Sequence, residues 1–151
     1  MGLPCKLIAQ VAFKAGGDVF HQILCNNPGH LVTTSPAKFQ GFDLHQGTLG
    51  ANGSVLFWKY TLDGKEQSCK QIIQDIDEVK KQITFKFIEG ELIEMYKNLI
   101  ITMHVETKNG IDYVTWTMEY EIIDDANPHP FSVLNFCVEF TSEIEHHIFG
   151  K

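Results

Sequence analysis

The sequence contains no arginine, because all twelve of its basic residues are lysines. Aspartate and glutamate outnumber these lysines, and the formal net charge is −7. Recognition of phosphate groups and guanine edges relies on bidentate arginine, and an acidic surface repels a phosphate backbone. The composition therefore argues against a nucleic-acid partner, and the same repulsion disfavours binding to anionic membrane surfaces.

The sequence also lacks the segments that would insert a chain into a membrane. Its apolar runs are far shorter than the roughly 20 residues that a spanning helix needs. Near the N-terminus, Gln10 and Lys14 interrupt an apolar stretch, which is atypical of a signal peptide. The expected location is therefore the cytoplasm, without membrane insertion.

Cysteine and histidine show none of the spacings that indicate a bridge or a metal site. Cys5, Cys25, Cys69 and Cys137 are irregularly spaced and form no C-x-x-C pair, so four reduced thiols are predicted. The seven histidines include no H-E-x-x-H motif. We therefore expect neither a metal nor a cofactor.

A glycine pattern at 47–53, G-x-x-G-x-x-G, superficially suggests a phosphate-binding loop. No Lys-Ser or Lys-Thr follows it, and strands rather than a helix are expected on its C-terminal side. Both the P-loop and the dinucleotide-binding interpretations therefore fail. The pattern is better explained as a glycine-rich connection between two strands.

What the sequence does contain is the pattern of an antiparallel sheet. Runs rich in β-branched and aromatic residues are separated by turn signals, and the pairs at 63–64 (DG) and 109–110 (NG) are typical of two-residue hairpins. Seven strands are predicted, at 6–14, 38–46, 53–61, 66–77, 82–88, 97–107 and 112–123. Apolar and polar residues alternate along several of them, which assigns one face to the interior. The residues expected to face inward are Ile83, Phe85, Phe87, Leu99, Ile101, Met103, Val105, Val114, Trp116, Met118, Tyr120 and Ile122.

Helices are predicted after the first strand and near the C-terminus. Asp18 suits the N-cap of a first short helix, and a second short helix runs from about residue 28 to 34. Near the C-terminus, Asn127 or His129 is expected to cap a helix with Pro130 at its first position. Apolar residues recur in this helix every three or four positions, and about 20 helical residues span roughly 30 Å. One helix cannot fill the concavity of seven strands, so an internal cavity for a small apolar molecule is expected.

The ordered blocks of sequence resemble a known family over essentially the whole chain. They are GDVFH at 17–21, SP at 35–36, QGFDL at 40–44, GTLGANGS at 47–54, FWKY at 57–60, DGK at 63–65, IDE at 76–78, FKFIEGELIEMYK at 85–97, VTWT at 114–117 and IEHH at 144–147. The sequence resembles the major latex protein and ripening-related (kirola-like) branch of the plant birch-pollen-allergen superfamily, also called pathogenesis-related class ten. The glycine loop departs from the family pattern, since Gln46, Thr48 and Leu49 stand where acidic residues and a tryptophan are usual.

The resemblance implies an α+β helix-grip fold in a single ligand-binding domain over residues 1–151. In this fold a seven-stranded curved antiparallel sheet, with two short helices after strand 1, surrounds a long C-terminal helix and an internal cavity. Family members bind flavonoids, cytokinins, sterols and other apolar metabolites, which implies a role in defence, ripening or specialised metabolism. The expected partner is thus a small apolar metabolite, and the chain itself is expected to be a monomer or a weak homodimer.

Aromatic and apolar residues at inward positions are the candidate ligand-binding set, although aromatic residues at this spacing often form a plain core. The set comprises Trp58, Tyr60, Phe85, Phe87, Ile101, Met103, Trp116, Met118, Tyr120, Phe136 and Phe140. A storage or stress protein with an incidental cavity is a further interpretation.

Some relatives implied by the resemblance are enzymes, among them norcoclaurine synthase and a nepetalactol-forming cyclase. The norcoclaurine-type mechanism needs an inward lysine, and the segments 111–124 and 130–150 contain none. A cyclase or isomerase needs only a dry cavity and a group that moves a proton, for which Tyr60, Tyr120 and His30 are the candidates. His30 and His21 are alternatively interpreted as exposed helix histidines.

Overall fold

The computed structural model describes residues 3–150, and their strands form one seven-stranded antiparallel sheet. The sheet order is β1-β7-β6-β5-β4-β3-β2. The elements are β1 (Pro4–Ala12), α1 (Gly17–Asn26), α2 (His30–Thr34), β2 (Phe39–Gln46), β3 (Val55–Leu62), β4 (Lys65–Asp77), β5 (Gln82–Gly90), α3 (Leu92–Met95), β6 (Tyr96–Lys108), β7 (Ile111–Ile122) and α4 (Phe131–Phe149). The predicted α+β helix-grip architecture is confirmed. Of the expected domain 1–151, Met1, Gly2 and Lys151 lie outside the described residues.

Two tight turns fix the meander from β3 to β4 and from β6 to β7. Asp63 and Gly64 have φ values of 52° and 75°, and Asn109 and Gly110 have values of 53° and 77°. Positive φ at both central residues defines the type I′ turn, which matches the twist of the flanking strands. The two hairpins predicted from these dipeptides are therefore confirmed.

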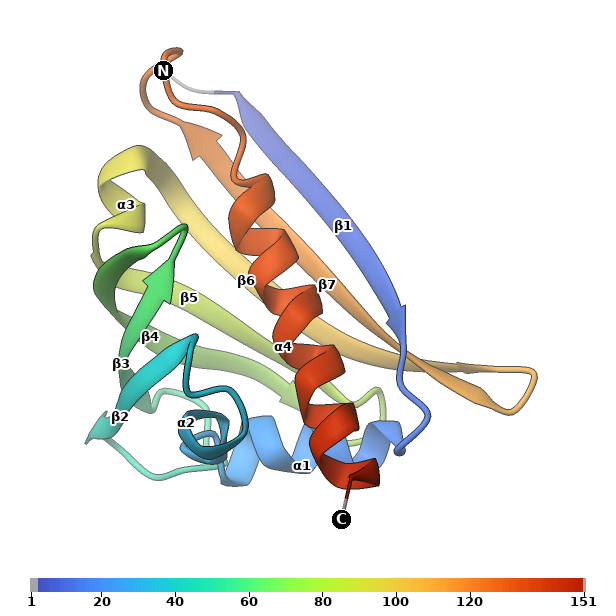
Figure 1. The fold of residues 1–151 in the computed structure, drawn as a ribbon. Coiled ribbons are helices and arrows are strands. Elements are labelled where there is room, and N and C mark those ends of the chain that lie inside the picture. The colour runs from blue at the N-terminus through green and yellow to red at the C-terminus, as the bar shows by residue number, and fades with distance from the viewer. Residues whose placement is uncertain (1–2, 151) are drawn as a thin grey trace.

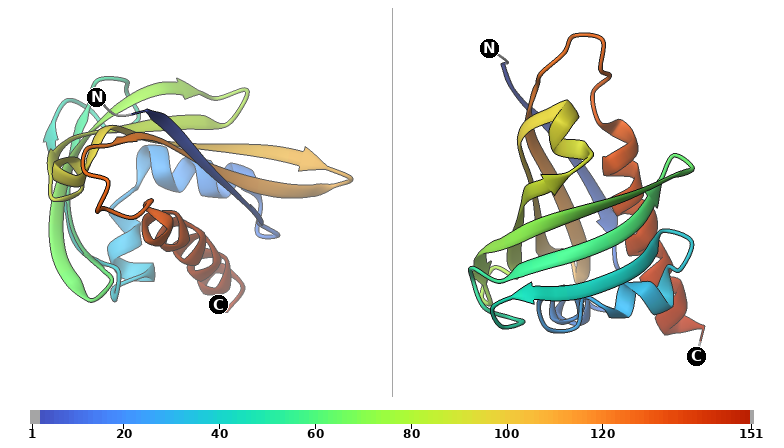
Figure 2. Two further views of the ribbon diagram at one scale, coloured as in Figure 1. Left: turned by 90° about the horizontal axis from the view of Figure 1, so that it is seen from above. Right: turned by 90° about the vertical axis from the view of Figure 1, so that its left-hand side faces the viewer.

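The first and last strands of the chain lie side by side, because β1 pairs with β7 along its whole length. The sheet curves around α4, which crosses its concave side, while α1 and α2 lie together near the C-terminal end of α4 (Figures 1 and 2). The hydrophobic core, with residues from the strands and from α1, α2, α3 and α4, lies between the sheet and the helices. No helix within residues 3–150 combines the length and the apolar character needed to cross a bilayer.

The alternation along the strands predicts the buried face correctly. Eleven of the twelve residues expected to face inward are at most 9% exposed, and the exception is Ile122, which is partly buried at the end of β7. Thr115, expected to face outward, is also buried, because the amide of Gln10 on β1 covers it and donates a hydrogen bond to its hydroxyl. The sheet therefore has one fully dry side and a convex side on which some polar residues are shielded by their neighbours.

The start of α1 differs from the sequence prediction. The N-cap is Gly16, with φ 103°, and the helix begins at Gly17 rather than after an Asp18 cap. Gly16 offers no side chain, so the backbone N–H of Gly17 donates to a carboxylate oxygen of Asp112 at 2.7 Å. A residue distant in sequence thus satisfies a free N–H at this helix end.

The start of α4 and the presence of α3 also differ from the prediction. Neither Asn127 nor His129 caps α4, since Pro130 is its N-cap and makes no side-chain capping bond. The four-residue helix α3, beginning at Leu92, was not predicted, because one turn is too short to show a helical period. It connects β5 to β6 and places Leu92 in the interior.

Candidate ligand-binding cavity

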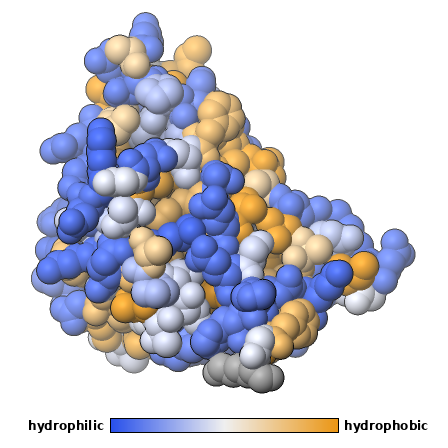
Figure 3. All heavy atoms as spheres, viewed as in Figure 1, coloured by the Kyte–Doolittle hydropathy of each residue, from blue (hydrophilic) through white to orange (hydrophobic). Residues whose placement is uncertain are grey.

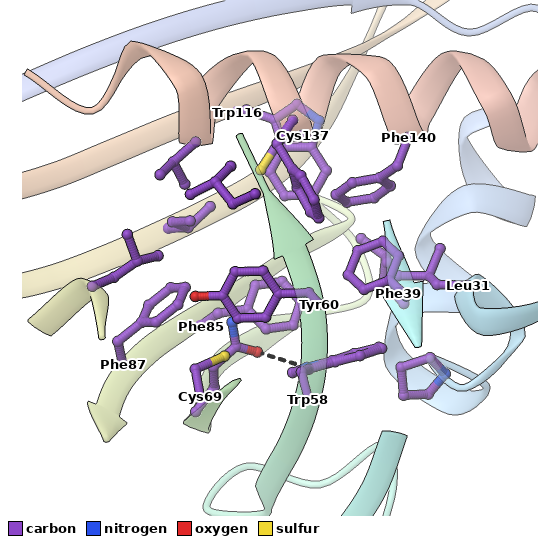
Figure 4. Close-up of a pocket in the computed structure, with 18 residues that line it drawn as sticks. Leu31, Phe39, Trp58, Tyr60, Cys69, Phe85, Phe87, Trp116, Cys137 and Phe140 are labelled. Carbon is purple, nitrogen blue, oxygen red and sulfur yellow. Dashed lines mark hydrogen bonds between the residues drawn. The ribbon is translucent and has the colours of Figure 1, made fainter. Parts of the chain in front are cut away.

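A cavity of about 80 Å³ lies between the concave face of the sheet and α4 (Figure 4). This volume is several times the roughly 10–15 Å³ that one water molecule needs. Its wall draws residues from all four helices and from every strand except β1. The lining residues are Leu24, Pro28, Leu31, Phe39, Trp58, Tyr60, Leu62, Cys69, Gln71, Phe85, Phe87, Leu92, Ile101, Trp116, Val133, Phe136, Cys137 and Phe140.

One wall of the cavity comes from the inward face of the β3–β4 hairpin. The period of two along β3 places Trp58, Tyr60 and Leu62 on this face, and all three are buried. On β4, Cys69 lies opposite Trp58 in the register, and Gln71 lies two residues further on the same face. The hairpin thus contributes two aromatic rings, a thiol and an amide to one surface.

The roof of the cavity is one face of α4. Val133, Phe136, Cys137 and Phe140 are three or four residues apart and therefore share a helical face. The ring of Phe136 packs edge-on against those of Phe39 and Tyr60, with centroid distances of 5.2 and 6.0 Å, and Phe140 packs against Trp116 at 5.3 Å. These ring contacts connect the roof to β2, β3 and β7.

Hydrogen bonds within the β3–β4 hairpin satisfy the polar groups of its two aromatic rings. The indole N–H of Trp58 donates to Oε1 of Gln71 at 3.0 Å, the dashed line in Figure 4. The hydroxyl of Tyr60 donates to Oε1 of Gln67 at 2.9 Å. Both rings therefore present mainly carbon to the cavity.

The second indole is satisfied by the helix above it. The N–H of Trp116 donates to the hydroxyl of Thr141 at 2.9 Å, and this hydroxyl donates to the backbone carbonyl of Cys137 at 2.7 Å. All three residues are buried. This chain of hydrogen bonds fixes the orientation of α4 over β7.

Burial keeps the ionisable groups of the wall uncharged. It raises the pKa of the Cys137 thiol to about 12 and, together with the charge of Glu91, that of Cys69 to about 12. Burial, aided by Cys69 and Glu91, also raises the pKa of the Tyr60 hydroxyl well above its usual value. At neutral pH the thiols and the phenol are protonated, so the thiols are poor nucleophiles.

The structure brings most of the predicted ligand-binding residues together around the cavity. Those that line it are Trp58, Tyr60, Phe85, Phe87, Ile101, Trp116, Phe136 and Phe140. Met103 and Met118 do not line it, because they are completely buried within the packed core. Tyr120 does not line it either, since its hydroxyl lies 2.6 Å from Nδ1 of His129 in the segment before α4.

Of the three candidate proton-transfer residues, only Tyr60 lines the cavity. His30 lies on α2 with its ring edge-on to that of His147 on α4, at a centroid distance of 5.7 Å. Tyr120 and His30, the other two candidates, do not line the cavity.

His21 is not an exposed helix histidine, because it is 1% exposed. Its Nε2 lies 3.3 Å from both the backbone carbonyl of Gln82 and the Cys25 sulfur, and its Nδ1 lies 3.6 Å from a Glu78 carboxylate oxygen. His21 is buried because the face of α1 that carries it packs against the start of β5. Within residues 3–150, no group of three or more His, Cys, Asp or Glu side chains is placed to hold a metal ion.

Ten lining residues were not among the predicted ligand-binding set. They are Leu24, Pro28, Leu31, Phe39, Leu62, Leu92, Cys69, Gln71, Val133 and Cys137. Helical periodicity carried a signal for Leu24, Val133 and Cys137, which belong to apolar stripes. No signal in the sequence marked Gln71, because a polar side chain on a strand is expected to face outward.

A second, more open depression lies between β1 and the first half of α4. It is lined by Ala9, Phe131, Ser132, Leu134, Asn135 and Val138. Hydrophobic side chains gather along this part of the surface in Figure 3. Phe131 at its edge is 61% exposed. The depression is more open to solvent than the cavity beneath α4, and fewer side chains line it, so that cavity is the better candidate site.

Comparisons with known proteins agree with this fold. The chain is 39% identical over 148 residues to MLP-like protein 31 of Arabidopsis thaliana, an alignment covering 97% of this chain and 86% of that protein. The crystal structure of ginseng major latex-like protein 151 from Panax ginseng matches with a TM-score of 0.93 and 42% identity, covering 97% of this chain and 98% of that one.

A more distant similarity shows the fold alone. Norcoclaurine synthase from Thalictrum flavum, in complex with dopamine and hydroxybenzaldehyde, matches with a TM-score of 0.70 but only 15% identity, covering 95% of this chain and 87% of that one. The family model described as the pathogenesis-related protein Bet v 1 family matches residues 3–151. The chain therefore belongs to the Bet v 1 family, with its similar relatives among the major latex proteins.

Proposed function

We propose that this protein binds a small apolar plant metabolite in its internal cavity. The observation that carries the proposal is the wall of this cavity, which is built almost entirely of carbon and contains no charged side chain among its lining residues. Burial of an apolar molecule there is favourable by roughly 25 cal/mol per Å² of surface removed from water. Membership of the Bet v 1 family supports the same function, in defence, ripening or specialised metabolism.

The two tryptophans of the chain provide the test, because both Trp58 and Trp116 line the cavity. Limonene, an uncharged cyclic hydrocarbon without absorption near 295 nm, is titrated while tryptophan emission is recorded. We expect a saturable change of emission at micromolar concentration. Absence of any saturable change for limonene and for similar apolar probes contradicts the proposal.

A pair of matched substitutions shows where the probe binds. Val133→Phe adds a ring to the roof of the cavity and is expected to abolish the change of emission, at a stability cost of about 1–3 kcal/mol. Val79→Phe places the same ring on a turn residue that is 90% exposed, and binding should persist. Circular dichroism verifies that both variants fold. Equal binding by both variants contradicts a site in the cavity.

A cyclase or isomerase of specialised metabolism that uses the same cavity is the second candidate function. Tyr60 is the observation that favours it, since it is the one candidate proton-transfer residue that lines the cavity, and its protonated hydroxyl would exchange its hydrogen bond to Gln67 for one to a reactive substrate. Purified protein would then accelerate or redirect cyclisation of a reactive enol-type terpenoid, and Tyr60→Phe would abolish this effect. Unchanged product formation with and without protein removes this candidate.

A cytoplasmic location is part of the proposal. The supporting observation is that Cys5, Cys25, Cys69 and Cys137 are all free thiols, as is usual for proteins in a reducing compartment. Fractionation of plant cells, followed by detection of the protein with an antibody, tests the location.

A further inference from the structure

The wall of the cavity contains one polar group that the protein leaves without a partner. Gln71 lines the cavity and is 9% exposed. Its Oε1 accepts the Trp58 indole N–H. Because an indole N–H can only donate, the amide oxygen must face Trp58 and the amide NH₂ group must point elsewhere. This nitrogen donates no hydrogen bond to residues 3–150, and since no buried side-chain nitrogen among these residues lacks a partner, it is accessible from the cavity.

The other polar groups around the cavity already donate to the protein. The Tyr60 hydroxyl donates to Gln67, and the Trp116 N–H donates to Thr141. Two buried thiols, those of Cys69 and Cys137, are weak donors. The Gln71 amide is thus the strongest donor on the wall that is available to a ligand.

The charges around the cavity disfavour an anionic ligand. Among the lining residues there is no lysine or histidine, and the chain has no arginine. The carboxylate of Glu91 contributes to the raised pKa values of Tyr60 and Cys69, so the charge felt most clearly at the β3–β4 wall is negative. A buried anion with no cation beside it would be strongly destabilised.

We infer that the cavity selects an uncharged apolar molecule with a carbonyl oxygen, which accepts a hydrogen bond from the Gln71 amide. This inference depends on the proposed function and adds the chemical class of the ligand. A carbonyl is suited because it accepts without bringing a donor of its own that needs a partner. A ligand without an acceptor would cover this amide and leave it without a hydrogen-bond partner, and a carboxylate brings an uncompensated charge.

Three probes of nearly equal shape separate these possibilities. Acetophenone carries the carbonyl, α-methylstyrene replaces its oxygen with a CH₂ group, and benzoate replaces its methyl with a negatively charged oxygen. Each probe is titrated into ¹⁵N-labelled protein, and dissociation constants are obtained from chemical-shift changes. We expect acetophenone and α-methylstyrene to bind, benzoate to bind far more weakly, and the Gln71 side-chain NH₂ signals to shift with acetophenone only.

Substitution of the amide measures its contribution independently of probe solubility. In Gln71→Met the affinity ratio of acetophenone to α-methylstyrene should fall about two- to tenfold relative to the unmodified protein. Trp58→Phe/Gln71→Met removes the indole donor as well, and serves where Gln71→Met alone fails to fold. Gln74→Met, on the opposite face of the same strand, should leave the ratio unchanged.

The outcomes distinguish this inference from the proposed function. If both neutral probes bind with the same ratio in the unmodified protein and in the Gln71 variants, the Gln71 anchor is wrong and the proposed function stands. Benzoate binding as tightly as acetophenone overturns the selection for uncharged ligands. If neither neutral probe binds, the proposed function fails and this inference fails with it.

Discussion

The hydroxyl of Thr141 holds the Trp116 ring against α4, and its loss should be costly. We expect Thr141→Val to destabilise the protein by about 1–3 kcal/mol, because the substitution keeps the shape but leaves the buried indole N–H without an acceptor. Thermal and urea unfolding measure the effect. The exposed neighbour Ser142 provides the control, and Ser142→Ala should change stability by less than about 0.5 kcal/mol. Equal stabilities of the two variants would contradict the structural role given to this hydrogen bond.

At the level of single residues, the sequence predicts which side chains are buried better than it predicts which of them line the cavity. Alternation places both Met103 and Trp116 on the inward face, and both are buried. It cannot tell which inward side chain borders empty space, because that depends on how closely the layer above approaches. Trp116 lies under α4 and lines the cavity, whereas Met103 is enclosed by packed neighbours. Gln71 was not predicted to face inward for a different reason: its amide oxygen accepts a hydrogen bond from Trp58 on a neighbouring strand, which allows a polar side chain to be buried.

At the level of elements, the start of α1 depends on a carboxylate from β7. Asp112 accepts hydrogen bonds from the Thr107 hydroxyl and the Gly17 N–H, and these bonds hold the pKa of its carboxyl below the usual value. The charged form is therefore favoured in the folded protein. Its contribution to stability is complete above the unfolded pKa of about 3.9 and is lost as pH falls through the lower folded pKa.

Asp112→Asn should lower stability at pH 7 by about 1 kcal/mol, a modest value because solvent reaches this carboxylate. The variant should also lose the part of the stability decrease that the unmodified protein shows below about pH 4. Urea unfolding at pH 7 and at pH 3 measures both effects. Asp125→Asn, in the exposed segment before α4, is the matched control and should match the unmodified protein at pH 7. A variant with the same pH dependence as the unmodified protein would show that Asp112 does not anchor α1.

The sequence predicts the elements well and their ends less well. The seven strands, α1 and α4 are recovered because each has a period of two or of 3.6 residues over enough length, and α2 is recovered because Pro28 and Pro36 bound it. Helix starts depend on single capping contacts, and at α1 the contact comes from Asp112, which is 95 residues away from Gly17. The residues near Gly17 in the sequence do not indicate that Asp112 accepts its N–H. The single-turn helix α3 is missed because it has no period at all.

At the level of the whole molecule, the sheet and α4 leave less free space than a typical ligand pocket has. The cavity of about 80 Å³ is well below the roughly 300–1,000 Å³ usual for drug-sized ligands. Aromatic side chains from both layers occupy the remaining volume, with Phe136 and Phe140 from α4 facing Phe39 and Tyr60. Large ligands are accommodated only if these rings move, so the rings set the size limit.

Phe87→Ala should relax this limit, because Phe87 lines the cavity and is 8% exposed. The substitution is expected to cost about 3–5 kcal/mol in stability and to leave a larger cavity. The affinity ratio of naphthalene to benzene, measured by NMR titration, should rise relative to the unmodified protein. Phe149→Ala removes the same ring at a site that is 61% exposed, and both stability and ratio should stay close to the original values. An unchanged ratio in a folded Phe87→Ala protein would mean that the rings of the wall do not determine ligand size.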